Sequence, residues 1–285
     1  MANEIGIAEA GSTRQALVSS IVQEVIAEKA QLLPLVTDYS GQAQPGSLSL
    51  GIPRRDTFAA ATKSENTAVS NSEMTFSVDT ITFEHKYVSA KIEDMARVQS
   101  SVDIPSEVVK EIGEAMAREA DALILAQLKL AQASHLKAYT DATNDDIELA
   151  DVISMRTLLR SNGKVHFNDP AKPNFLLVSP EQEGYLLSLQ NLIDASKYGD
   201  SSVIMNGEIG SVFGLRVIVS DLLDADECIA FAKDSVAFAA QQQFKLEFDR
   251  DLANLADFYV GSGLFGAKVL HAGKRNVFLA DGHTA

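Results

Sequence analysis

The side chains best suited to nucleophilic or metal chemistry are few and far apart in this chain. They are one cysteine, Cys228, and five histidines, His85, His135, His166, His271 and His283. None of them has the close spacing, such as i, i+4 on a helix, that supplies zinc ligands. The cysteine opens an apolar run, which favours a small buried side chain over an activated thiol. The pattern therefore favours packing or surface roles for these residues.

Two other stretches could bind ions or cofactors, and both have a simpler interpretation. The acidic run 221–227 lacks the glycine and the distal glutamate of an EF-hand, so it fits a solvated turn. The glycines of 206–214 (NGEIGSVFG) precede a strand instead of leading from a strand into a helix, unlike a dinucleotide-binding loop. Glu119 and Asp121 lie two residues apart on a predicted helix and point in different directions. We expect no catalytic residue, no cofactor site and no metal site.

One basic cluster stands out against this background. Arg54 and Arg55 are adjacent at the foot of a predicted hairpin, and Lys63 lies further along the same hairpin. Such charges can simply protect an exposed strand edge. They can also form a docking patch that meets acidic residues of a neighbouring subunit and sets the register of the contact. These three residues are our candidates for intersubunit contact.

Length and charge limit the class of protein. A chain of 285 residues is long enough for two lobes. Its net charge of −15 argues against sequence-independent binding of nucleic acid, which needs clustered lysine and arginine. A single cysteine allows no intrachain disulfide and fits synthesis in a reducing cytoplasm. No signal peptide and no membrane-spanning run is expected.

A long helix is the most informative predicted element. The stretch 104–130 would extend about 40 Å at 1.5 Å per residue, more than a compact domain is wide. Asp103 is the predicted N-cap, and Pro105 falls in the first turn, where its missing N–H costs little. The apolar stripe expected to be buried consists of Ile104, Val108, Ile112, Met116, Leu123 and Leu130.

The segments before this helix have no core of their own. An amphipathic helix is predicted over 12–33, ending before Pro34, and has the spacing of a capping box at its start. Two strands, 48–52 and 76–83, enclose a polar tip and form a long hairpin. The apolar alternation slips at 79–80, which predicts a bulge or a strong twist.

In the second half of the chain, predicted helices and strands alternate. A helix over 147–159, a strand at 174–179, a helix over 180–190 and a strand at 213–220 predict an α/β lobe. From Cys228 onward the chain is mostly strand without intervening helices, which predicts an antiparallel sheet. We expect this tail to return and pack on the long helix.

In this order the elements resemble the major capsid proteins of tailed bacteriophages, with their Hong Kong 97-type fold. LLPLVTDYSG leading to SLSLGIPRR is similar to the N-terminal arm entering the extended loop, and IPSEVVKEIGEAMAREADALIL is similar to the spine helix. NFLLVSPEQEGYLLSL with GLRVIVSDLL resembles the axial domain. ECIAFAKDSVAFAAQQQFKLEFDRD resembles the strand that returns to the peripheral domain.

The resemblance implies an α+β chain in four parts. These are an N-terminal arm (1–46), an extended β-hairpin loop (47–92), a peripheral domain with the spine helix (93–140 and 228–285) and an α/β axial domain (141–227). Some members of the family crosslink a loop lysine to an asparagine. Lys63 would be the donor, but no acceptor stands out, and we do not expect the crosslink.

The implied function is structural. Copies of the chain would form pentamers and hexamers in an icosahedral shell around double-stranded DNA, assembled in the host bacterial cytoplasm and present in the virion. A separate scaffolding protein, a portal protein and a possible decoration protein are the implied partners, and no membrane is involved. Two alternatives stay open: an encapsulin-type nanocompartment shell that holds protein, and an α/β enzyme with an unrecognised site.

Overall fold

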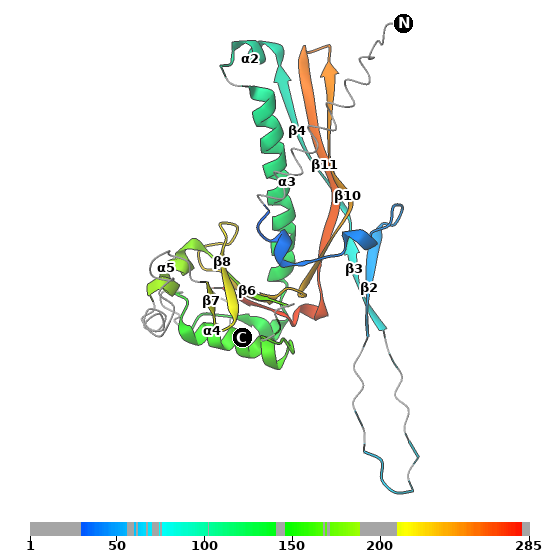
Figure 1. Cartoon of the computed structure of the whole chain (residues 1–285), viewed down its shortest axis with the longest axis vertical. Helices are drawn as coiled ribbons and strands as arrows, with labels where there is room; N and C mark the ends of the chain where they lie inside the picture. Colours follow the sequence, from blue (N-terminus) through cyan, green and yellow to red (C-terminus); the bar gives the residue numbers. More distant parts are fainter. Residues whose placement is uncertain are drawn as a thin grey trace.

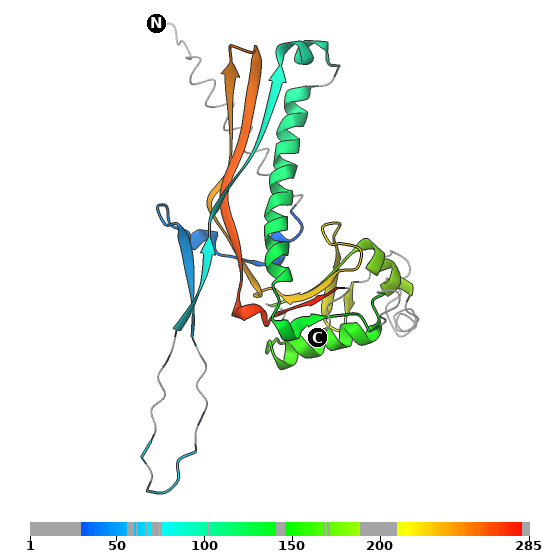
Figure 2. The same ribbon diagram turned by 180° about the vertical axis from the view of Figure 1, so that it is seen from behind.

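A computed structural model of the chain is shown in Figure 1. The structure describes residues 30–55, 60, 62–66, 68–69, 74, 76–101, 103–140, 146–167, 169, 172–188 and 210–280. A long blade of helix and sheet meets a compact lobe at one end, and the two-stranded ribbon of β2 and β3 lies beside the same end of the blade (Figure 1). Seen from behind, the lobe and the ribbon lie on opposite sides of the blade (Figure 2). Most of the predicted N-terminal helix, with its capping box, lies outside the described residues. Its predicted end is wrong, because residues 30–32 are not helical and Leu33–Leu35 forms a 3-10 turn that includes Pro34.

The blade and the ribbon contain the longest elements. They are β1 (Thr37–Asp38), β2 (Ser49–Arg55), β3 (Phe76–Thr82), β4 (Glu84–Glu93), α2 (Asp94–Gln99), α3 (Ile104–Lys129), β10 (Val236–Asp251) and β11 (Ala256–Val269). The lobe contains β5 (Leu136–Lys137), α4 (Leu149–Ser161), β6 (Asn174–Val178), α5 (Pro180–Ser188), β7 (Ser211–Val212), β8 (Leu215–Val219), β9 (Cys228–Ala232) and β12 (Asn276–Leu279). Short 3-10 turns occur at Leu33–Leu35, Ser40–Gln42, Ala133–His135 and His271–Gly273. None of the described helices combines the length and apolarity needed to cross a membrane.

Helix α3 begins after Asp103, with Pro105 in its first turn, as predicted. Its buried face differs from the predicted stripe, because Leu130 is 54% exposed and only two of the six stripe residues are buried. The buried positions are Val109, Ile112, Gly113, Met116, Ala117, Ala120, Asp121, Ile124, Leu125 and Leu128. Several of these are small residues, which allow the sheet to approach the helix closely. The close packing of the sheet on these small residues determines which face of α3 is buried.

Strand β11 forms the other side of this close contact. It lies between β10 and β4, antiparallel to both, in a sheet of order β1-β10-β11-β4. A β-carbon added at Gly261 would lie 2.5 Å from Cγ2 of Ile112 and 2.6 Å from Cζ of Phe244, distances that real side chains do not adopt. The predicted return of the tail onto the long helix is thus confirmed, and glycine on β11 makes it possible.

The predicted bulge at 79–80 is wrong. Strands β2 and β3 pair in continuous register from Ser49 opposite Thr82 to Arg55 opposite Phe76. The apparent slip arises because apolar side chains occupy both faces of β3, with Ile81 buried and Phe76 exposed.

Strand pairing also places several strands with other parts of the chain than those to which the sequence assigned them. Residues 84–92, assigned to the extended loop, form most of β4 and pair with β11 in the blade. β9 and β12, assigned to the peripheral domain, lie in the six-stranded sheet of the lobe, of order β5-β12-β9-β6-β8-β7. Every residue of β9 is buried, and such an apolar strand requires partners at both edges, here β6 and β12.

The lobe otherwise follows the prediction. Helix α4 covers one face of its sheet, and α3 contributes to the core on the other face. β6 is buried throughout and runs parallel to β8. Helix α5 begins as expected, with the Ser179 hydroxyl oxygen accepting the N–H of Gln182 at 3.3 Å. These contacts make the lobe a two-sided α/β layer built onto the end of α3.

A buried carboxylate attaches the first described residues to α3. Asp121 accepts the backbone N–H groups of Gln31 at 2.7 Å and Leu32 at 3.1 Å. Burial raises the pKa of Asp121, and these hydrogen bonds act in the opposite direction. The side chain of Leu32 is fully buried in the core beside α3. One ionisable group thus anchors the chain segment that precedes the blade.

We expect Asp121→Ala to lower the free energy of unfolding by about 1–3 kcal/mol, because two N–H groups lose a buried acceptor. Urea unfolding of the unassembled subunit measures this change. Asp103→Ala is the matched control on the same helix, because the Asp103 side chain makes no capping hydrogen bond. Equal stability of the two variants would contradict the anchoring role.

A second prediction concerns the close contact of β11 with α3. We expect Gly261→Ala to destabilise the subunit by about 1–3 kcal/mol through overpacking. Gly184→Ala is the control, because a β-carbon at this position of α5 meets nothing within 4 Å and alanine favours a helix. Thermal unfolding should show a lower midpoint for the first variant and an equal or higher midpoint for the second.

Candidate intersubunit surfaces

The foot of the hairpin has one face against the blade and one face in solvent. Leu50 and Ile52 pack with the buried Ile81 and with residues of β10. On the opposite face Pro53 pairs directly with Val78, and Phe76 follows two residues away. Phe76 is 64% exposed and Val78 is 58% exposed. We call Pro53, Phe76 and Val78 the outer face of the hairpin.

This outer face is unusual for a surface made by two strands alone. A two-stranded ribbon is marginally stable in water, and exposed aromatic and branched apolar side chains usually gather where another surface covers them. Among the described residues, no other element of the chain covers Phe76 or Val78, which remain largely solvent-exposed. The outer face is therefore the strongest candidate for contact with a second molecule.

The three candidate residues predicted from sequence are placed differently from one another. Arg54 lies on the inner side, where its Nε donates to the hydroxyl of Ser77 at 3.1 Å and its guanidinium lies 3.9 Å from Asp79. Arg55 pairs opposite Phe76 through the backbone, and its side chain lies outside the described residues. Lys63 is exposed in the hairpin tip. The structure thus gives Arg54 partners within the hairpin and places Lys63 apart from it, in the tip.

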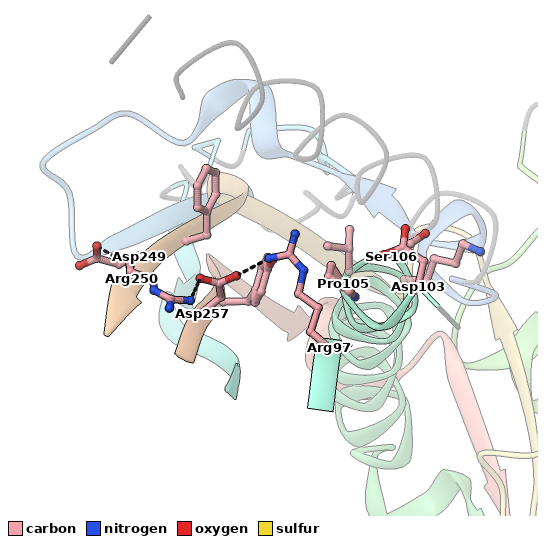
Figure 3. Close-up of a pocket in the computed structure, with 11 residues that line it drawn as sticks. Arg97, Asp103, Pro105, Ser106, Asp249, Arg250 and Asp257 are labelled. Atoms are coloured by element: carbon pink, nitrogen blue, oxygen red, sulfur yellow. Dashed lines mark hydrogen bonds and ion pairs between the residues drawn. The ribbon is translucent and has the colours of Figure 1, made fainter. Parts of the chain in front are cut away.

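The far end of the blade carries a charge network that the sequence analysis missed (Figure 3). The Arg250 guanidinium donates to Asp94 at 2.6 Å and to Asp257 at 2.9 Å, and Arg97 donates to Asp257 at 3.1 Å. The hydrogen bonds to Asp94 and Asp257 raise the pKa of Arg250, and Arg250 in turn lowers the pKa of Asp94. Alternating charge along one strand, from Asp249 to Asp251 on β10, was the available signal. Its partner on α2 could not be read from that pattern.

A pocket of about 620 Å³ lies beside this network, between the start of α3 and the ends of β10 and β11. Exposed apolar side chains occur at the same end, on α2 and in the turn after β10. They are Met95, Val98, Leu252 and Leu255. We call α2 and residues 249–257 the distal end of the blade. It combines paired charges with uncovered apolar area, as contact surfaces between proteins commonly do.

Several of the remaining candidate groups have structural roles. Cys228 is buried, and desolvation raises its pKa to about 12, so its thiol is not poised as a nucleophile. In the acidic run, Glu227 pairs with Lys129 at 2.6 Å. The buried ring of His135 lies 3.0 Å from the carbonyl oxygen of Asn276. Over the described residues, no cluster of histidine, cysteine and carboxylate side chains is arranged to hold a metal ion.

The turn that leads into β8 accounts for the described glycines of the run 206–214. Gly210 and Gly214 both have positive φ, of 62° and 80°, which fits tight turns. Gly207 lies outside the described residues. The outer face of the hairpin and the distal end of the blade are the surfaces best suited to contact with other proteins. The buried candidate groups stabilise the fold that positions these surfaces.

Comparison with known proteins agrees with this interpretation. A family model described as phage capsid protein matches residues 75–276, which is more than half of the chain. No curated protein matches the chain in sequence.

Solved structures share the fold at low identity. A chain of Mycobacterium phage Che8 superposes with a TM-score of 0.72 at 19% identity, covering 88% of this chain and 90% of that chain. A chain from the capsid of cyanophage P-SCSP1u gives 0.69 at 16% identity, covering 88% and 87%. A virus-like particle from Pyrococcus furiosus gives 0.59 at 13% identity, covering 93% and 99%.

These findings confirm the predicted α+β fold of the Hong Kong 97-like capsid type. The family match adds what structural likeness alone does not show. The chain belongs to the phage capsid protein family, and it is a major capsid protein with a structural role in a phage shell.

Proposed function

We propose that copies of this chain assemble into pentamers and hexamers that close an icosahedral shell around double-stranded DNA. The observation that carries the proposal is the outer face of the hairpin, where Phe76 and Val78 are exposed on a ribbon that projects from the blade. A ribbon of this kind gains stability when it lies on another subunit. In a closed shell every subunit both offers and receives such a ribbon.

Shell geometry explains why modest surfaces suffice. A subunit in a ring contacts several copies at once, so weak contacts add through effective concentration. Closed symmetry requires that each surface meets a matching surface on a neighbour. The outer face of the hairpin lies near the lobe end of the blade and α2 lies at the other end, which suits contacts with different neighbours (Figure 1).

Within this proposal the chain divides as the resemblance implied, with boundaries adjusted to the strand pairing. Residues 1–46 form the arm and 47–82 the extended loop, since β4 belongs to the blade. The blade with α3 is the peripheral domain. The lobe, with β9 and β12 included, is the axial domain.

Contents and partners are also part of the proposal. A net charge of −15 disfavours adhesion of DNA to the wall, which suits a container that must release its genome. We propose a separate scaffolding protein, a portal protein and a decoration protein as further partners. Assembly would take place in the host bacterial cytoplasm.

A second candidate is an encapsulin-type shell, a compartment filled with protein. The virus-like particle from Pyrococcus furiosus is also similar to this chain in fold. Its TM-score of 0.59 is lower than the 0.72 of the Mycobacterium phage chain, and the matching family is one of phage capsids. Electron microscopy and nucleic-acid assay of purified particles decide between the two. Particles filled with protein and free of DNA would overturn the phage shell.

We expect Phe76→Ser with Val78→Ser to leave a folded subunit that assembles poorly, because each apolar side chain loses about 1–3 kcal/mol of burial at the contact. Size-exclusion chromatography and negative-stain imaging measure the fraction in shells. Phe76→Leu with Val78→Ile is the matched control, since it keeps the face apolar and should assemble. Equal yields from both double variants would sink the role of the outer face.

A separate prediction tests the basic foot of the hairpin. Arg54→Glu with Arg55→Glu should leave the subunit folded and impair assembly, because docking onto an acidic neighbour becomes repulsive. Arg54→Gln with Arg55→Gln separates lost attraction from added repulsion and should be milder. Since Arg54 also bonds Ser77, circular dichroism of the free subunit must first show an intact fold. Normal shells from the charge-reversed protein would count against the basic patch.

A further inference from the structure

A groove on the surface of the lobe is lined by basic and apolar side chains. It measures about 490 Å³ and lies between α4 and the turn before β8. Its lining consists of Ile153, Arg156, Thr157, Arg160, Ser161 and Phe213. The α4 residues among them lie on the face opposite to the buried Val152, Met155 and Leu159, as helical spacing requires.

The two arginines of this groove have no carboxylate partner in the part of the chain that the structure describes. Throughout the described residues, no ion pair involves Arg156 or Arg160. The Arg156 guanidinium lies 5.0 Å from the centre of the Phe167 ring, which holds it in place. Beside them, Ile153 and Phe213 are exposed. The groove thus presents two positive charges and two apolar side chains to solvent in a strongly acidic chain.

A complementary surface lies toward the other end of the lobe. There the Tyr185 ring is 39% exposed. A hydrogen bond to Asp146, with the negative charges of Glu181 and Asp226 nearby, raises the pKa of Tyr185. We call Asp146, Glu181, Asp226 and Tyr185 the acidic edge.

Local contacts fix the acidic edge in place. The Ser179 hydroxyl donates to the carbonyl of Ala225 at 2.6 Å, which holds the start of α5 against the acidic turn. The N–H of Ile147 donates to the side-chain oxygen of Gln182 at 2.8 Å, which brings the start of α4 to the same place. The acidic edge is therefore a built surface with a defined shape.

Strand direction separates the groove from the acidic edge. β6 begins at Asn174, whose amide donates to His166 just beyond the end of α4, and it ends where α5 begins. The second half of α4 therefore lies toward the start of β6, and the acidic edge lies toward its end. Both helices lie at the margin of the lobe (Figure 1). Two different, complementary surfaces on one subunit are what a head-to-tail contact in a ring requires.

We propose that the acidic edge of one subunit docks in the α4 groove of the next, with Tyr185 against Ile153 and Phe213 and with Glu181 and Asp226 facing Arg156 and Arg160. The proposal rests on the proposed function, because it assigns one contact within the rings of the shell. Identical acidic edges gathered around an axis would repel one another. Docking each edge on a pair of arginines removes that repulsion and sets the register of the ring.

A second copy of the chain fits the groove better than DNA does. A phosphate backbone would use the arginines and leave Ile153 and Phe213 uncovered, and the surrounding acidic protein would repel it. An aromatic ring flanked by carboxylates uses both kinds of lining. DNA binding by the groove is therefore the rival outcome of the test.

Charge exchange in the full-length chain provides the test. Arg156→Glu with Arg160→Glu reverses the groove, and Glu181→Arg with Asp226→Arg reverses the acidic edge. Each variant alone should lose shells, or need about tenfold more subunit for half-assembly, because the contact becomes repulsive. A chain that carries all four substitutions should assemble again. The matched control, Arg156→Lys with Arg160→Lys, keeps the charge and should assemble as the unaltered chain does.

Two arrangements make the result specific. In a mixture of the two reversed variants, every edge meets a groove of opposite charge only when the variants alternate around the ring. Alternation needs an even number of subunits, so the mixture should form hexamers and no pentamers. Arg160→Glu alone serves if loss of the Arg156 contact with Phe167 unfolds the subunit, which thermal unfolding of the free protein reveals. Assembly of both reversed variants at the unaltered concentration would overturn the proposal and leave the shell function standing.

Two further readouts separate the rival explanations. If the groove-reversed variant assembles normally but loses binding to a duplex DNA in a gel-shift assay, the groove is a DNA contact and the proposal fails. Tyr185→Cys combined with Thr157→Cys should give a ladder of oxidised oligomers, since the native cysteine is buried. An unaltered chain that forms no shells, with no such ladder, would overturn the shell function and this contact together.

Discussion

The close approach of strand β11 to helix α3 is the constraint on which the rest of the structure depends. Glycines on the strand and small residues on the helix remove the side chains that would keep the two apart. With that contact made, β10 and β4 flank β11, and the blade becomes a single layer of sheet on one helix. The lobe then forms on the lower part of the same helix, and the hairpin extends from the strand that leads into β4. The contact between β11 and α3 therefore determines the orientation of the elements that carry the candidate contact surfaces.

Sequence patterns predicted most of the elements because each has a local cause. Pro105 marks the start of α3, where Asp103 holds the N-cap position without a side-chain cap, and the Ser179 hydroxyl caps the start of α5. The uninterrupted apolar run of β6 predicts a buried strand, and the absence of helices after Cys228 predicts an antiparallel tail. These signals arise within a few residues of the feature that they specify. These signals therefore do not depend on contacts with distant parts of the chain.

The failures have a common origin in contacts between distant segments. The buried face of α3 is chosen by β11, more than a hundred residues later, so its own periodicity could not identify it. The alternation in β3 was taken for a bulge because the strand carries apolar residues on its solvent side as well as on its buried side. The charge network around Arg250 joins α2 to two later strands. Asp121, set aside as a catalytic candidate, gains its role from backbone groups ninety residues earlier in the chain.

The placement of Asp121 within α3, away from both helix ends, has a mechanical consequence. The charge network around Arg250 steadies the blade beside one end of the helix, and the lobe is built onto the other end. A tension applied to the chain before Gln31 would therefore act on α3 between the end held by the charge network and the end held by the lobe. The response would be bending along its length, with little tendency to peel the helix from its end. A subunit of this design can transmit strain from its arm to both extremities at once.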